Sequence, residues 1–101
     1  MSVPTTNKTY KAIWNGVVLA ESANAVKFAG QIYFPPDSIK SKYFEDSAKH
    51  TTCPFKGTAS YKNIKVKNQE NKDAAWYYPE PKDAAKQITG YFAFWKGVKV
   101  E

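Results

Sequence analysis

Alternating apolar and polar residues run through the first third of the chain and predict short β-strands. Residues 10–14, YKAIW, alternate in this way, and Asn15-Gly16 directly after them carries a strong two-residue hairpin signal. Residues 26–34 repeat the arrangement around Ala29-Gly30. The pattern therefore predicts an antiparallel meander for this part of the chain.

The pattern changes at Pro35-Pro36, where proline ends the strand and suits the first turn of a helix. Ile39 and Tyr43 are four residues apart and would share one face of that helix. We therefore expect a short helix at 36–44, followed by a loop from Ser47 to Gly57.

The strand expected at 58–67 has a break in its apolar pattern. Ala59 and Tyr61 occupy odd positions, whereas Ile64 and Val66 occupy even ones. One strand face cannot hold both pairs in a regular register. The sequence predicts either a β-bulge near Lys62-Asn63 or a strand whose two halves bury opposite faces.

The rest of the chain predicts more strands and a second short helix. A polar turn at 68–72 is followed by strands at 73–78 and 91–95, and a helix at 81–88 fits between them. Together the elements predict a mainly β fold, at most α+β, as one compact antiparallel domain over 10–101. Residues 1–9 are polar and are expected to form a flexible N-terminal segment.

Composition agrees with a single globular domain. The 101 residues include six Phe, seven Tyr and three Trp, enough large rings to build one core. The single cysteine cannot form an internal disulfide, and no apolar segment approaches the roughly 20 residues that span a bilayer. We expect a soluble protein of a reducing compartment, the cytoplasm, with no membrane partner.

The positive charge does not by itself indicate a nucleic-acid-binding protein. The net charge is +6, but all fifteen basic residues are lysines. Arginine, which makes bidentate contacts with phosphate and guanine, is absent. Scattered lysines are typical of a solvated face or a protected sheet edge, so we expect no specific nucleic-acid partner.

Five segments, in this order and spacing, resemble the family known as domain of unknown function 427. They are WNGVVLAES at 14–22, YFPP at 33–36, HTTCPFKGTASY at 50–61, DAAWYYPEP at 73–81 and AFW at 93–95. The resemblance runs from about residue 10 to the C-terminus. It implies a small, single-domain, mostly β protein of the β-tent kind.

The family has also carried a nucleotidyltransferase-type name, which the residues do not support. Nucleotidyl transfer uses carboxylates that hold Mg²⁺ beside a phosphate-binding glycine loop. Asp73 and Glu80 stand alone in the sequence, and no Gly-x-Gly or Gly-Lys-Ser/Thr motif occurs. One cysteine and one histidine cannot complete a four-coordinate zinc site, so we expect neither a metal nor a cofactor.

The leading functional hypothesis is a pocket between the 50–61 and 73–81 segments. Lysine, glycine and aromatic residues in both segments fit a small-molecule site with apolar walls and a few polar groups. The expected ligand is small and anionic or aromatic, and His50 and Cys53 would lie on the rim. The expected ligand-binding residues are Lys56, Gly57, Tyr61, Trp76, Tyr78 and Glu80.

Two alternatives remain open at this stage. Cys53 could act as a nucleophile with His50 as its base and Lys56 stabilising the thiolate, which would make the protein a hydrolase or transferase. The chain could instead be a scaffold whose exposed aromatic face binds another protein or forms a homodimer. Both alternatives compete with a purely structural interpretation, in which 50–61 is a packed corner with a buried cysteine.

Overall fold

The computed structural model describes residues 8–101, and residues 1–7 of the expected flexible segment lie outside the described residues. The strands are β1 Tyr10–Trp14, β2 Val17–Ser22, β3 Val26–Phe28, β4 Gln31–Tyr33, β5 Phe44–Cys53, β6 Gly57–Val66, β7 Gln69–Tyr77, β8 Phe92–Phe94 and β9 Lys99–Val100. Three 3₁₀ segments accompany them: η1 Pro36–Ser38, η2 Ser41–Tyr43 and η3 Asp83–Ile88. The prediction of a mainly β fold is confirmed.

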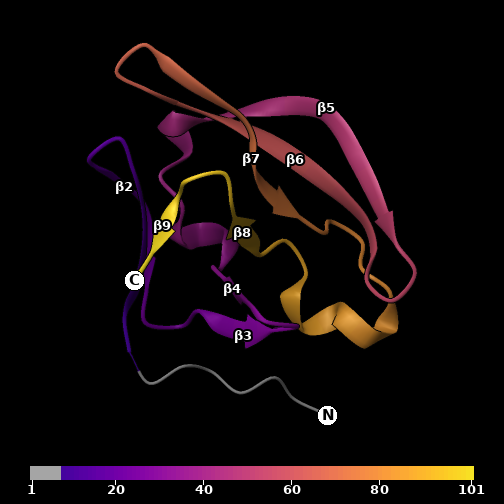
Figure 1. The fold of residues 1–101 in the computed structure, drawn as a ribbon. Coiled ribbons are helices and arrows are strands. Elements are labelled where there is room, and N and C mark those ends of the chain that lie inside the picture. Colours follow the sequence, from indigo (N-terminus) through magenta and orange to yellow (C-terminus); the bar gives the residue numbers. More distant parts are fainter. Residues whose placement is uncertain (1–7) are drawn as a thin grey trace.

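The strands form three antiparallel sheets, in the orders β2-β1-β9, β3-β4 and β5-β6-β7-β8. In Figure 1 the long strands β5, β6 and β7 arch over the upper part of the molecule, with the β3–β4 hairpin and η3 below them. Phe34 and Phe92 exchange two backbone hydrogen bonds of 2.8 Å, which fasten the β3–β4 hairpin to β8. Within residues 8–101, no helix is long and apolar enough to cross a membrane.

Three hairpins turn through two residues, at Asn15-Gly16, Ala29-Gly30 and Lys67-Asn68. All six residues have positive φ angles between 51° and 81°, as a turn that matches the twist of the strands requires. The first two turns confirm the sequence prediction. The expected turn at 68–72 was too long, because residues from Gln69 onward already pair with β6.

The loop predicted from Ser47 to Gly57 was wrong, because most of it belongs to β5. His50 to Cys53 pair in regular register with Ser60 to Gly57 of β6, and only residues 54–56 form the turn. β5 is the first strand of its sheet, and most of its side chains are exposed on both faces. Such a strand lacks the apolar alternation by which a sequence reveals it.

The helix predicted at 36–44 is two separate 3₁₀ turns, η1 and η2. Between them Ile39 is extended, with φ −85° and ψ 148°, and forms an antiparallel bridge with Ala20 of β2. The hydrogen bond from the Lys40 amide to the Leu19 carbonyl, 2.8 Å, holds this bridge in place. The second helix is also 3₁₀, with a kink at Ala85, and it buries Ala85 and Ile88.

Of the two alternatives for β6, the strand whose halves bury opposite faces is confirmed. A register shift does lie between Lys62 and Ile64, but the extra residues belong to β7, because Lys62 pairs with Ala75 and Ile64 with Asn71. β6 therefore supplies Ile64 to one apolar cluster, the first cluster, and Ala59 to another, the second cluster, because odd and even positions of a strand point to opposite faces. β8 separates the same two clusters, because successive side chains of a strand point to opposite faces. Phe92 and Phe94 pack into the first cluster, while Ala93 packs into the second.

Candidate functional site

A cavity of about 300 Å³, which we call the aromatic cavity, lies on the side of the second cluster. Four of its residues are among those predicted from the sequence: Lys56, Tyr61, Trp76 and Tyr78. The other three are Ala29 and Gln31 of the β3–β4 hairpin and Trp95, which follows β8. Residues from four distant parts of the chain therefore meet at one site.

Strand pairing explains why the aromatic side chains lie on the same face. Tyr61 of β6 is the cross-strand neighbour of Trp76 on β7, and Trp76 is the neighbour of Ala93 on β8. Tyr78 and Trp95 each lie two residues further along, which returns their side chains to that face. The register of β6, β7 and β8 therefore places these aromatic side chains together in one wall of the cavity.

Two perpendicular indoles form one corner of the aromatic cavity. The ring centroids of Trp76 and Trp95 are 6.2 Å apart, with an angle of 89° between the planes. Trp76 makes a second edge contact with the fully buried Tyr33, at 6.5 Å and 88°. The inner indole is therefore fixed by core packing, whereas Trp95 remains 43% exposed.

A polar network holds Trp95 in this position. Its indole Nε1 donates a hydrogen bond of 2.6 Å to the Asp73 carbonyl. Asp73 has a φ of 58°, its amide donates to the Asn63 side chain at 2.9 Å, and its carboxylate accepts a hydrogen bond from Ser47. Because these contacts join β5, β6 and β7, the orientation of Trp95 depends on all three strands.

Among residues 8–101, Lys56 is the one charged residue that lines the aromatic cavity. Its Nζ lies 6.0 Å from the ring centroids of Tyr78 and Phe28. Within residues 8–101 the ion pairs join Lys62 to Asp46, Lys65 to Glu45 and Lys99 to Glu101, so the half-buried Lys56 has no carboxylate partner there. The site therefore carries an uncompensated positive charge.

The phenol of Tyr78 has a raised pKa, so its ionisation can be measured in a pH titration. Burial raises the pKa of Tyr78 to about 12, and the nearby Tyr33, Cys53 and Tyr61 groups add to the effect. An unfolded tyrosine has a pKa of about 10, so the folded protein holds this proton more tightly. Its contribution to stability is present below about pH 10 and is lost as the pH rises to about 12.

Tyr78→Phe tests this assignment. We expect the variant to lose one tyrosinate step near pH 12 in an ultraviolet absorbance titration and to unfold with a weaker pH dependence above about pH 10. The expectation fails if the two proteins show the same stability profile in that range. Tyr43→Phe, which removes a half-buried phenol packed against the other cluster, is the control.

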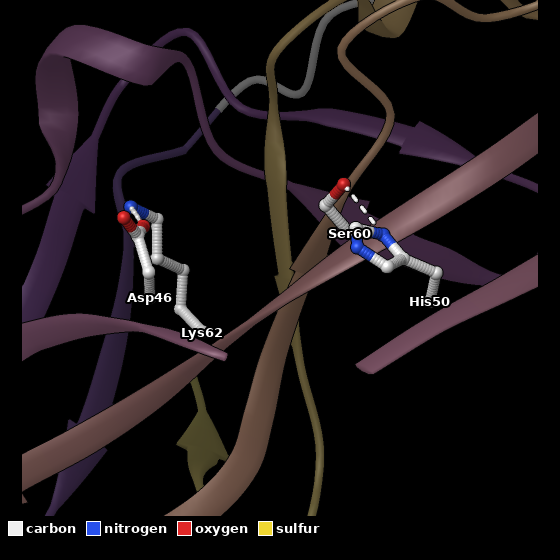
Figure 2. A network of polar contacts seen from close by, with 4 residues as sticks. All are labelled: Asp46, His50, Ser60 and Lys62. Carbon is white, nitrogen blue, oxygen red and sulfur yellow. Dashed lines mark hydrogen bonds and ion pairs between the residues drawn. The ribbon is translucent and has the colours of Figure 1, made fainter. Parts of the chain in front are cut away.

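The structure does not bring Cys53 and His50 together. They lie three positions apart on a regular part of β5, so their side chains project from opposite faces. The exposed His50 ring is hydrogen-bonded through Nδ1 to the Ser60 hydroxyl at 3.2 Å, and a Lys62–Asp46 ion pair of 2.5 Å joins the same two strands (Figure 2). His50 therefore has a cross-strand partner and no contact with the thiol.

Cys53 is half-buried at the start of the 54–56 turn. The backbone amides of Lys56 and Phe55 donate to its sulfur and lower the pKa of the thiol, and the charges of Lys56 and Lys82 act in the same direction. Partial burial opposes this shift. The turn thus favours the thiolate of Cys53, while the His50 imidazole lies on the other face of β5.

Gly57 and Glu80, predicted as ligand-binding residues, lie beside a different hollow of about 430 Å³ that also includes His50. Gly57 is buried, with a φ of +111°, and a Cβ there would lie 3.4 Å from the Glu80 carbonyl oxygen. The backbone that lies against Gly57 therefore belongs to residues 80–82 of the same chain. The six expected ligand-binding residues are divided between two sites.

Sequence reasoning did not identify Ala29, Gln31 and Trp95 as lining residues. Trp95 ends an apolar run, FAFW, and precedes Lys96-Gly97, a position at a strand end where a large ring can remain exposed. No comparable signal marks Gln31, because its place depends on how the β3–β4 hairpin docks on β8.

Comparison with known families agrees with the five segments noted in the sequence. A family model described as Domain of unknown function (DUF427) matches residues 2–101. The chain belongs to this family. A search of curated proteins found no match. Since the DUF427 description assigns no activity, function has to be argued from the aromatic cavity itself.

Proposed function

We propose that this DUF427 chain is a small-molecule-binding module whose ligand occupies the aromatic cavity. The observation that carries the proposal is the meeting of four aromatic side chains and one unpaired lysine around about 300 Å³ of space. Small-molecule sites of about 300–1,000 Å³ are usually lined by apolar and aromatic groups with a few polar ones. The cavity fits the lower end of that range.

The exposure of Trp95 supports the proposal. A tryptophan that is 43% exposed leaves apolar surface in water, which a bound ligand would cover. The Asp73 carbonyl holds this indole in place, so little side-chain freedom would be lost on binding. The unpaired thiol of Cys53 is consistent with a cytoplasmic module.

A fragment screen followed by nitrogen-15 NMR tests the proposal. The indole N–H signals of Trp76 and Trp95 should move when a fragment binds, while that of Trp14, which packs against the other cluster, should stay in place. Trp95→Ala should weaken binding about tenfold or more, because it removes a ring that the ligand would cover.

Phe55→Ala is the matched control. Phe55 is 76% exposed and lies outside the aromatic cavity, so its loss removes an exposed ring without changing the site. The proposal is abandoned if no fragment in a broad library shifts the Trp76 or Trp95 signals. It is also abandoned if the two alanine variants bind a fragment equally well.

A further inference from the structure

The charges around the aromatic cavity indicate the sign of the charge that a bound ligand would carry. Lys56 lines it, the Nζ of Lys49 lies 5.3 Å from the ring centroid of Tyr61, and that of Lys96 lies 5.3 Å from the ring of Trp95. None of these three lysines forms an ion pair with a carboxylate of residues 8–101. No acidic residue of the described part of the chain lines the cavity. The surroundings therefore favour an anion and repel a cation.

The lysines also act against the recognition of a cation by the rings. An aromatic cage binds a cation through the negative faces of its rings. Lys49 and Lys96 already place an ammonium group over Tyr61 and Trp95. A cationic ligand would thus compete with these two ammonium groups for the ring faces. It would also be repelled by the ammonium group of Lys56, which no carboxylate of residues 8–101 neutralises.

The corner between Trp76 and Trp95 favours a flat ligand. Because the indole planes are at 89°, a ring that stacks on one indole presents its edge to the other. Aromatic rings carry a negative face and a positive edge, so both contacts are favourable for a planar ring. A saturated ring of similar size would gain only from the removal of apolar surface from water.

The polar groups indicate a single negative charge. One lysine, Lys56, lines the cavity itself and can balance one carboxylate, and the exposed side chain of Gln31, another lining residue, offers an amide. Phosphate sites commonly use arginine forks or several backbone amides at a helix N-terminus. The lining holds no arginine, because the chain contains none.

We propose that the aromatic cavity binds a planar aromatic monocarboxylate, with its ring in the Trp76–Trp95 corner and its carboxylate at Lys56. This inference rests on the proposed function and specifies the ligand class. Lys56 is then a specificity-determining residue, and replacing it changes which ligand charge is accepted.

Four probes of similar size separate the contributions of charge and planarity. NMR titrations would compare benzoate with benzamide, benzylammonium and cyclohexanecarboxylate, using the Trp76 and Trp95 indole signals. Benzoate should bind about tenfold tighter than benzamide, because both can accept a hydrogen bond from Lys56 but only benzoate adds the attraction between two opposite charges. Benzylammonium should bind more weakly still, and cyclohexanecarboxylate should bind more weakly than benzoate.

Lys56→Gln should reduce benzoate to the affinity of benzamide, and Lys56→Glu should reverse the order so that benzylammonium binds better than benzoate. Lys11→Gln is the control, because it lowers the net charge equally from an exposed position on β1. It should leave the preference for benzoate unchanged.

The outcomes separate this inference from the proposed function. If the Trp76 and Trp95 signals respond to the probes but benzylammonium binds wild type best, the binding module stands and the ligand class is wrong. The same conclusion follows if cyclohexanecarboxylate equals benzoate, or if Lys11→Gln has the same effect as Lys56→Gln. If none of the four probes shifts these signals, the inference is overturned, and the broad fragment screen alone decides the proposed function.

Discussion

Phe34→Ala is expected to lower the free energy of unfolding by about 3–5 kcal/mol, the usual cost of truncating a fully buried phenylalanine. Phe34 is 0% exposed and packs edge-on against Phe94, with ring centroids 5.6 Å apart. Its backbone also bridges to Phe92 and so joins the β3–β4 hairpin to β8. The cavity left by the ring would therefore lie where two sheets meet.

Denaturant unfolding measures this effect. Because a domain of this kind is stable by about 5–15 kcal/mol in total, Phe34→Leu provides a milder variant if the alanine protein does not fold. Phe55→Ala removes the same side chain from a site that is 76% exposed and should change stability by no more than about 0.5 kcal/mol. Equal losses in the two alanine variants would contradict the assignment of Phe34 to the core.

The turns show how far local sequence determines the fold. Asn15-Gly16 and Ala29-Gly30 could be predicted because each contains glycine, which adopts positive φ without steric cost. Lys67-Asn68 makes the same kind of turn with φ angles of 52° and 65°, but lysine carries no such signal. The strand β7 was therefore expected to begin several residues too late.

The helical segments and β5 show where backbone pairing overrides the local sequence pattern. The spacing of Ile39 and Tyr43 fits a helix, yet the bridge between Ile39 and Ala20 makes the backbone extended at that point. β5 is paired on one side only and exposed on both faces, so its polar sequence resembles a loop. For Ile39 the deciding contact comes from a residue far away in the chain, whereas β5 is paired with the adjacent strand of its own hairpin.

The candidate site was predictable to the extent that it depends on one hairpin. Tyr61 and Trp76 become neighbours through the β6–β7 pairing, which the two adjacent segments already suggested. Trp95 and Gln31 reach the cavity through β8 and its contact with the β3–β4 hairpin. No local signal specifies that contact, so three of the seven lining residues, Ala29, Gln31 and Trp95, required the structure.

Gly57→Val is expected to cost about 2–6 kcal/mol, because it combines a strained backbone with overpacking. Gly57 has a φ of +111°, and a Cβ there would lie 3.4 Å from the Glu80 carbonyl oxygen and the Lys82 amide nitrogen. The additional methyl groups of valine would have to displace the backbone of residues 80–82. Denaturant unfolding measures the loss.

Gly97→Val separates the cost of the strained backbone from the cost of overpacking. Gly97 has a φ of +85° but no atom within 4 Å of its Cβ position, so it incurs the backbone cost without the clash. Gly57→Val should also weaken ligand binding, since the Lys82 amide donates a 2.9 Å hydrogen bond to the Lys56 carbonyl. A shift of residues 80–82 would therefore move the lysine of the aromatic cavity. Equal destabilisation in both variants, with benzoate binding unchanged in Gly57→Val, would show that the close packing at Gly57 neither stabilises the fold nor positions Lys56.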